Sequence, residues 1–459
     1  MRRKIFIKNI SLATAGLYLT PGVLSSCKKD DNKQVNWDGK VIIIGAGVAG
    51  LEAAKKLSAA GVKFINILEA NNRWGGRVKT LTGFADFPVE LGAEEIHGEK
   101  SDFKKMFDKQ GKTLIDSYDS EDYFFYKGNL ITGTNISNDS DFKKAQKIAD
   151  EISEYAGGDV SVLQHIISNN ITQPELVAYL NAILGNENGT DISKISMKGL
   201  ALNDNLWSAG EKNFVAQNAS IYEVLASNYI NQLSLINYEK QVNSINYSGE
   251  QIEVKTTGNE TFLADKVIVT VPISVLKKNI ILFSPALPQN KLNAIQQIGF
   301  DSGMKIIIKF SQRFWAEDTG SIYGEGYVPE FWTTGLNKGT NNVLTAFVMG
   351  DKATYLSSLG NNAIQEVLMQ LNAMYGNNVA TNNYQSHFIM DWSKEPFIEG
   401  AYSFPQVGTS GAFLNLSLPV NDKLYFAGEA THSGGHNATV HGAIETGQRV
   451  AEEIINSIS

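Results

Sequence analysis

The segment Val41-Ile42-Ile43-Ile44-Gly45-Ala46-Gly47-Val48-Ala49-Gly50 decides the fold of this chain. Its first four residues form an uninterrupted β-branched and aliphatic run, which is typical of a strand buried in a parallel sheet. Residues 48–60 then have the pattern of a helix that ends at Gly61, and residues 64–68 have the pattern of a second strand. The sequence therefore predicts a strand–helix–strand unit of about 30 residues.

The three glycines of this segment have separate tasks in a dinucleotide-binding turn. Gly45 permits the tight turn, Gly47 lets the backbone approach a pyrophosphate, and Gly50 lets the helix pack closely on the strand. Glu69 follows the second strand, 19 residues after Gly50, where a carboxylate can accept hydrogen bonds from ribose hydroxyls. The glycine pattern alone is a weak signal, and its alternative is a glycine-rich turn in an unrelated sheet. Strand, helix and acid together predict a dinucleotide-binding site.

Length and charge limit the class of protein. A chain of 459 residues suits two domains, and 43% hydrophobic with 19% charged residues fits a globular protein. The formal net charge of -8 argues against a nucleic-acid partner. After the N-terminus, no apolar run is long enough to span a bilayer.

The N-terminus has the pattern of an export signal. Arg2-Arg3-Lys4 is followed by a mostly apolar stretch at residues 10–24, and Leu24-Ser25-Ser26-Cys27 resembles a bacterial lipobox. We expect residues 1–26 to be a signal peptide and residues 27–38 to be a lipidated Cys27 with a polar tether. This predicts an exported lipoprotein, periplasmic or at the cell surface, anchored in the membrane at Cys27. The alternative is a buried free thiol, and a single cysteine excludes an intramolecular disulfide.

Two further glycine-rich segments extend the pattern. Arg73-Trp74-Gly75-Gly76-Arg77 follows Glu69, and Leu424-Tyr425-Phe426-Ala427-Gly428-Glu429 runs into Gly442-Ala443-Ile444 near the C-terminus. In this order the motifs resemble the flavin-containing amine oxidase family, which includes monoamine oxidases, polyamine oxidases and lysine-specific histone demethylases. The resemblance implies that the dinucleotide is FAD.

The resemblance extends from about residue 39 to residue 455. Further segments that carry it are residues 90–98, 269–276, 303–306 and 439–443. Residues 102–220 match poorly, and Gln217-Asn218-Ala219 stands where the family commonly has two glycines. Because of this departure, the resemblance is a weaker guide to the substrate pocket, whereas what it implies about the cofactor site is unaffected.

The resemblance implies a set of FAD-binding residues. Arg73 and Arg77 would neutralise pyrophosphate oxygens, the alternative being a surface arginine pair. Ala401 stands where monoamine oxidases attach the flavin through cysteine, so non-covalent binding is expected. The complete set is Gly45, Gly47, Val48, Ala49, Gly50, Glu69, Ala70, Arg73, Gly75, Gly76, Arg77, Gly92, Ala93, Glu94, Val242, Val271, Gly428, Glu429, Thr439, Val440 and Ala443.

Three catalytic residues are implied by the same resemblance. Lys305 would hydrogen-bond a water beside flavin N5, which matters for the reaction with oxygen; the alternative is a surface lysine on an edge strand, and Lys309 lies nearby. Tyr402 would form one wall of an aromatic cage around the amine, or else be a core residue. Thr439 takes the place of the second aromatic wall, so the cage is half built.

Charged residues and histidines indicate which class of substrate is bound and whether a metal site is expected. An amino-acid oxidase usually binds the substrate carboxylate with arginine, and none of the six arginines lies in residues 102–206, which favours a free amine; the alternative is a lysine in place of the arginine. Glu94, Glu95 and His97 border the expected pocket and either attract a cation or are simply solvated. We predict no metal site at the histidines near the C-terminus, His432, His436 and His441, because they have neither a cysteine nor an ordered acidic partner beside them.

The predicted fold class is α/β, with a Rossmann-like FAD-binding domain and an inserted substrate domain of helices on a mixed sheet. The FAD-binding domain comprises residues 39–100, 226–285 and 396–459, and the substrate domain comprises a helical part at 101–225 and a second part at 286–395. Asparagine-rich stretches at 135–141 and 377–383 are expected to be loops. The oligomeric state is not predicted.

The resemblance implies an FAD-dependent amine oxidase. A hydride would pass from the carbon next to a primary or secondary amine, a polyamine included, to flavin N5. Oxygen would then reoxidise the flavin and release hydrogen peroxide, and the imine product would hydrolyse to an aldehyde. The alternatives are a related flavoenzyme, such as a C–C desaturase or an L-amino-acid oxidase, and a non-catalytic lipoprotein stabilised by FAD.

Overall fold

The computed structural model describes residues 34–117, 119–336, 338–339 and 342–459. The expected signal peptide at 1–26, Cys27 and the tether up to residue 33 lie outside the described residues. Among the helices that are described, none combines the length and apolar character that crossing a bilayer requires.

The predicted strand–helix–strand unit is present at the expected positions. Strand β1 (Lys40–Ile44) leads into helix α1 (Val48–Ala59) and strand β2 (Phe64–Leu68). These strands belong to a five-stranded sheet in the order β10-β2-β1-β14-β23, in which every pair is parallel. The other strands are β10 (Ile236–Asn237), β14 (Lys266–Val269) and β23 (Leu424–Phe426). The sheet thus gathers distant parts of the chain, and its strands end at one common edge.

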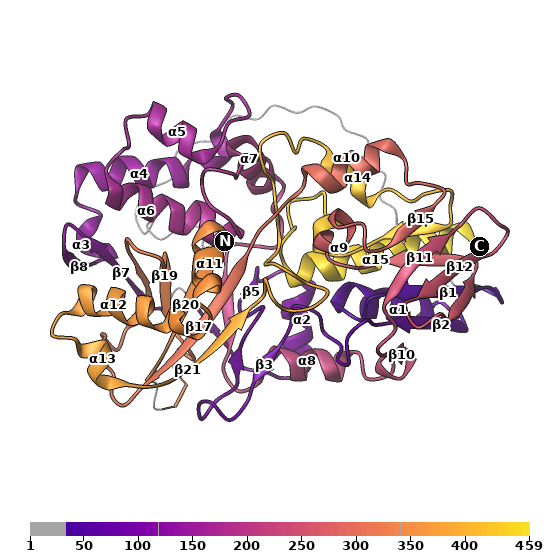
Figure 1. Ribbon diagram of the computed structural model, residues 1–459, viewed down its shortest axis with the longest axis horizontal. Helices are drawn as coiled ribbons and strands as arrows, with labels where there is room; N and C mark the ends of the chain where they lie inside the picture. Colours follow the sequence, from indigo (N-terminus) through magenta and orange to yellow (C-terminus); the bar gives the residue numbers. More distant parts are fainter. Residues whose placement is uncertain (1–33, 118, 337, 340–341) are drawn as a thin grey trace.

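Both faces of this sheet are covered, which explains the unbroken apolar run in β1. Ile43 packs in a core with α1 and α15 (Val440–Ser457), whereas Ile42 packs against a second sheet. That sheet has the order β13-β12-β11-β15, and Figure 1 shows it beside β1 and β2. Its strands are β11 (Val242–Asn246), β12 (Ile252–Thr256), β13 (Thr261–Ala264) and β15 (Leu282–Ser284).

A seven-stranded mixed sheet forms the other half of the molecule, in the order β21-β17-β20-β19-β18-β7-β8. Strand β17 (Gly303–Phe310) is antiparallel to both of its neighbours, β20 (Val343–Met349) and β21 (Tyr384–Asp391). The alternative that places Lys305 on an edge strand is therefore wrong. The remaining strands are β18 (Thr319–Tyr323), β19 (Glu330–Thr333), β7 (Glu121–Tyr126) and β8 (Asn129–Thr132).

Residues 101–225 are less uniformly helical than predicted. Helices α4 (Ser140–Asp150), α5 (Val162–Ser168), α6 (Pro174–Leu180) and α7 (Met197–Leu206) do surround a common core. Strands β7 and β8, however, form a hairpin whose turn contains Lys127 and Gly128, both with positive φ. Strand β7 pairs with β18, so the hairpin belongs to the seven-stranded sheet. Helices α2 (Asp102–Lys109) and α8 (Ile221–Asn228) pack instead in the core around α1.

Both loop predictions are partly wrong. The first asparagine-rich stretch contains the end of α3 (Gly133–Ile136) and the start of α4, where the Asp139 side chain caps the helix by accepting the N–H groups of residues 141 and 142. The second stretch contains α13 (Val379–Asn383). The other elements are β3 (Thr80–Leu81), β4 (Val89–Glu90), β5 (Ile96–His97), β6 (Leu114–Asp116), β9 (Asn213–Ala216), β16 (Gly299–Phe300), β22 (Ser403–Phe404), α9 (Ile273–Lys277), α10 (Gln289–Gln297), α11 (Gly350–Leu359), α12 (Ala363–Tyr375) and α14 (Ala412–Ser417).

Candidate active site

A cavity of about 400 Å³ lies between the two halves of the molecule. Its lining includes residues at the carboxyl ends of β1 and β2 and residues of β17, β19 and β20 in the seven-stranded sheet. All the residues predicted to bind the cofactor line this cavity except Gly50, and so do Lys305, Tyr402 and Thr439. Residues far apart in the sequence therefore meet around a space of the size that small-molecule sites have.

The glycine-rich turn leaves room for a ligand at one position and packs tightly at the others. A Cβ at Gly50 would lie 2.2 Å from the Gly45 carbonyl oxygen, so Gly50 serves packing. A Cβ at Gly47 would meet no described atom within 4 Å beyond its chain neighbours, and Gly47 lines the cavity. In the part of the chain that the structure describes, no side chain caps the start of α1. The free N–H groups and the open space fit a pyrophosphate.

Glu69 is held rigidly at the same edge of the cavity. One carboxylate oxygen accepts the Ala46 N–H at 2.7 Å, and the other accepts the Asn71 N–H at 2.9 Å. Burial raises the pKa of Glu69, an effect that these bonds and Arg73 partly offset. Each oxygen keeps a second lone pair, so the carboxylate fits a ribose with two hydroxyl donors.

The two arginines of the first motif form ion pairs that the sequence did not predict. Arg77 donates to Glu429 at 2.7 Å and to the Ala401 carbonyl at 3.0 Å, whereas Arg73 pairs with Glu395 at 3.2 Å. Their charges are thus balanced by carboxylates, and both residues also line the cavity, where the role as phosphate counter-ions stays a prediction. The surface-pair alternative is wrong, because only 22% and 26% of the two side chains are exposed. Arg73 Nε, buried and without a partner in the described residues, still offers a bound group one donor.

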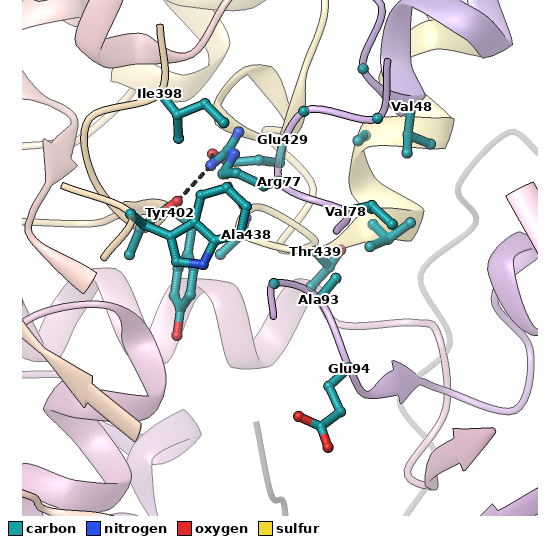
Figure 2. Close-up of a pocket in the computed structure, with 18 of the residues that line it drawn as sticks. Val48, Arg77, Val78, Ala93, Glu94, Ile398, Tyr402, Glu429, Ala438 and Thr439 are labelled. Atoms are coloured by element: carbon teal, nitrogen blue, oxygen red, sulfur yellow. Dashed lines mark hydrogen bonds and ion pairs between the residues drawn. The ribbon is translucent and has the colours of Figure 1, made fainter. Parts of the chain in front are cut away.

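The Arg77–Glu429 pair joins the first and last parts of the cofactor region, as Figure 2 shows. Only 6% of the Glu429 side chain is exposed, and it also accepts the Ser403 hydroxyl at 2.5 Å and the Ala438 N–H at 2.8 Å.

Replacing Arg77 by Ala is expected to lower the free energy of unfolding by about 2–4 kcal/mol, because Glu429 would remain buried without its cation. Denaturant unfolding of the FAD-free protein measures this loss. The double variant Arg77→Ala, Glu429→Gln should recover part of it. Equal stability of the wild type and Arg77→Ala would show that the pair does not join the two segments.

Lys305 is almost completely buried, with 4% of its side chain exposed. Its ammonium donates to the carbonyl oxygens of Glu90 at 3.2 Å and Gly92 at 2.9 Å and to the Glu94 carboxylate at 2.7 Å, and it lies 4.9 Å from the Trp332 ring centre. Three acceptors match its three N–H donors, so a bond to the predicted water requires sharing one of them. The sequence did not predict that Glu94 is the partner of Lys305. The alternative that Glu94 is simply solvated is wrong, because its carboxylate pairs with this lysine.

The aromatic wall is larger than the sequence indicated. Tyr402 lines the cavity, as its cage role requires, and its hydroxyl donates to the Glu187 carbonyl at 2.8 Å. Thr439 also lines the cavity, but its hydroxyl caps α15 by accepting the Gly442 N–H. Trp332 and Phe347 add a ring pair with centres 4.8 Å apart. Glu330 and Trp332 stand two residues apart on β19 and share one face, a spacing that could have identified Trp332 from the sequence.

Two of the histidines near the C-terminus form a hydrogen-bonded cluster with Glu445, so the prediction that they have no acidic partner is wrong. His432 Nδ1 accepts two backbone N–H groups, and His436 Nε2 accepts the Ser208 N–H, so both rings carry their proton on the other nitrogen. Those nitrogens, His432 Nε2 and His436 Nδ1, each lie 2.7 Å from the same Glu445 oxygen. A metal ion would need lone pairs where these protons are. The geometry therefore assigns the cluster to hydrogen bonding.

Glu445 makes this cluster sensitive to acid. Burial opposes its ionisation, but the hydrogen bonds from His432 and His436 outweigh burial and lower the pKa of Glu445 to about 2. Because this lies below the ordinary value of 4.5, the contribution to stability is present above pH 4.5 and is lost as the pH falls towards 2.

We expect the melting temperature of the wild type to fall more steeply between about pH 5 and pH 3 than that of Glu445→Gln. Glu452→Gln, which removes an exposed carboxylate of the same helix, is the matched control and should follow the wild type. Parallel curves for the wild type and Glu445→Gln would contradict the assignment.

Comparisons with known proteins agree with this site. The family model described as flavin containing amine oxidoreductase matches residues 48–145 and 143–455, including the region where the sequence resemblance was weakest. The chain is 30% identical to probable polyamine oxidase 4 of Arabidopsis thaliana over 90% of this chain and 86% of that protein. It is 28% identical to lysine-specific histone demethylase 2 of Homo sapiens, of whose length it covers 53%.

Solved structures show the same fold. A putrescine oxidase bound to putrescine has a TM-score of 0.75 and 21% identity, covering 92% of this chain and 99% of that one. Cyclohexylamine oxidase from Brevibacterium oxydans IH-35A has a TM-score of 0.76 and 20% identity, covering 92% of this chain and 100% of that one. The chain belongs to the flavin-containing amine oxidoreductase family, with FAD as its cofactor.

Proposed function

We propose that this FAD-dependent amine oxidase acts on amines that carry a second cationic nitrogen, with oxygen as the electron acceptor. The observation that carries the proposal is the cavity itself, where the FAD-binding motifs meet an aromatic wall and a group of carboxylates. FAD, held by the glycine-rich turn and Glu69, would supply the redox chemistry, namely hydride acceptance from the carbon next to the amine and two-electron reduction of oxygen to hydrogen peroxide.

The aromatic side chains hold the substrate and keep water from its reacting carbon. Tyr402, Trp332 and Phe347 give the cavity an apolar wall that fits an alkyl chain, and their ring faces attract a cationic nitrogen. The Tyr402 hydroxyl is fixed by the Glu187 carbonyl, and burial raises its pKa, so the phenol stays neutral.

The charge of the cavity favours a substrate with more than one amine. The lining holds the paired cations Arg73, Arg77, Lys240 and Lys305, each facing a carboxylate, and one further lysine, Lys338. Three further carboxylates, Glu95, Glu187 and Glu330, line the cavity and all act electrostatically on Tyr402. One amine must be neutral to lose a hydride, whereas a second ammonium on the same substrate gains from this negative field. The similarity to polyamine oxidases and to a putrescine oxidase supports this substrate class.

Glu187 is well placed to discriminate between amines. It lies on a short helical turn, Asn186–Asn188, that follows a π-helical turn at Asn181–Gly185, a feature that often marks functional sites. The neighbouring Asn186 fastens this turn to β20 by donating to the Phe347 carbonyl at 3.1 Å and accepting the Met349 N–H at 2.8 Å.

Amino acids are the less favoured substrates. Of the arginines in the described residues, only Arg73 and Arg77 line the cavity, and both are held by carboxylates. A substrate carboxylate would therefore lack a free guanidinium and would face a negative wall.

Steady-state release of hydrogen peroxide tests this proposal with putrescine, a monoamine of the same chain length and L-leucine. We expect the highest kcat/KM for putrescine. Replacing Glu187 by Gln should raise KM for putrescine about tenfold and leave the monoamine nearly unaffected. Equal kcat/KM for the two amines would overturn the preference, and peroxide release from L-leucine alone would identify an amino-acid oxidase.

We further propose that the enzyme is exported and anchored through a lipidated Cys27. The support is the signal pattern before this residue and the polar tether after it. Cells fed an alkyne-labelled fatty acid should label the wild type and leave Cys27→Ser unlabelled. Equal labelling of both would show that Cys27 is not the lipid anchor.

A further inference from the structure

The buried ammonium of Lys305 donates all three of its hydrogen bonds to one short stretch of chain. The acceptors are two carbonyl oxygens and one carboxylate of residues 90–94, which connect β4 to β5. Only the carboxylate of Glu94, at 2.7 Å, carries a charge opposite to that of the ammonium. Figure 2 shows that Glu94 points away from the Arg77–Glu429 pair, so the two ion pairs are separate.

The stretch that carries Glu94 has little freedom to move. A Cβ at Gly92 would lie 1.9 Å from the Arg77 carbonyl oxygen and 2.9 Å from the Trp392 ring, so the backbone is pressed between both. The Trp392 indole N–H also donates to the Leu91 carbonyl at 2.9 Å. Glu94 is therefore held against Lys305 by the packing of its own backbone.

We propose that Glu94 is a positioning residue that keeps Lys305 charged and fixed in the cavity wall. The inference rests on the proposed oxidase function, because the charge of Lys305 is expected to act on the reaction of the reduced flavin with oxygen. Glu94 acts through Lys305, and no contact between Glu94 and substrate is needed.

The other ionisable groups around Lys305 do not replace Glu94. Glu90 is buried, and its carboxylate already accepts the Ile221 N–H and the Thr80 hydroxyl; burial raises its pKa to about 7. Glu330 lies on β19, two strands from β17, and Phe347 on β20 is paired in register with both Lys305 and Glu330 and so lies between them. Lys338 lies on the cavity wall and adds positive charge.

Loss of the Glu94 charge is expected to favour the neutral amine form of Lys305 over the ammonium. A lysine buried without a counter-ion gives up its proton well below its ordinary pH range. In Glu94→Gln the amide still fills the space and accepts a hydrogen bond, but the charge is gone. Lys305 should then become neutral as the pH rises, and the positive charge in the wall should disappear with it.

The experiment uses the FAD-loaded enzyme, reduced by light without substrate and then mixed with oxygenated buffer between about pH 6 and pH 9. We expect the wild-type rate of flavin reoxidation to stay nearly constant. The rate of Glu94→Gln should match the wild type at the acidic end and fall about tenfold or more towards the alkaline end. Glu94→Asp, which keeps the charge, should largely restore the flat profile.

A second readout does not depend on turnover. The visible spectrum of the oxidised flavin in Glu94→Gln should change with pH at the same midpoint, and the change should vanish in the double variant Glu94→Gln, Lys305→Met. Glu99→Gln, an exposed carboxylate five residues further on, is the matched control and should follow the wild type.

Flat rate and spectral profiles in Glu94→Gln would overturn the inference. A wild-type flavin that oxygen does not reoxidise would overturn the proposed oxidase function instead, and the spectral titration would still decide the role of Glu94. Thermal unfolding and FAD content of each variant show that it is folded and loaded.

Discussion

Replacing Lys305 by Met is expected to slow reoxidation of the reduced flavin by oxygen about a hundredfold or more while FAD stays bound. The side chain projects from a central strand into the cavity wall, and its charge is held in a site with little water, where a charge has its greatest effect. Met keeps the length and apolar part of the side chain and removes the ammonium. Stopped-flow mixing of the reduced enzyme with oxygen measures the rate directly.

Lys309→Met is the matched control for this variant. Lys309 lies on the same strand and donates only a weak hydrogen bond of 3.3 Å to the Phe84 carbonyl. Because Lys305→Met leaves Glu94 buried without its cation, the double variant with Glu94→Gln separates loss of charge from loss of stability. Oxygen reactivity that is the same in Lys305→Met and in the wild type would remove Lys305 from the mechanism.

Substitution of the glycines by Ala should separate cofactor binding from folding. At Gly47 the new methyl group has space in the protein but enters the cavity beside the start of α1, so we expect FAD affinity to fall about a hundredfold with little change in the stability of the FAD-free protein. At Gly50 the methyl group would meet the Gly45 carbonyl at 2.2 Å, so this variant should be destabilised even without FAD.

Two measurements distinguish these outcomes: fluorescence titration with FAD, and thermal unfolding of the FAD-free protein. Gly158→Ala, at a glycine where an added Cβ also meets no described atom within 4 Å, is a control that should change neither. Full FAD affinity in Gly47→Ala would show that the pyrophosphate does not approach this turn.

Local patterns in the sequence were sufficient to predict the elements that carry the cofactor motifs. The run at residues 41–44, the helix after it and the strand at 64–68 appear where the pattern placed them, because a strand buried on both faces needs apolar residues throughout. The hairpin of β7 and β8 was missed because its Lys-Gly turn is a weaker signal than Asn-Gly.

The ion pairs of the site could not be predicted in the same way. Lys305 and Glu94 are 211 residues apart, and Arg77 and Glu429 are 352 residues apart, so only the folded chain brings them together. The resemblance supplied the positions of the motif residues, but it contained no information on which carboxylate faces which cation. For the same reason the sequence did not predict that Arg73 and Arg77 pair with Glu395 and Glu429.

The most direct test of the central claim is the visible spectrum of the purified chain without residues 1–27, recorded without oxygen before and after adding amines. The account predicts that putrescine or a longer polyamine bleaches the oxidised-flavin band and that admitting oxygen restores it with release of hydrogen peroxide. A flavin that stays oxidised with diamines, monoamines and amino acids alike would contradict the account and would favour a C–C desaturase or a protein in which FAD serves only the fold.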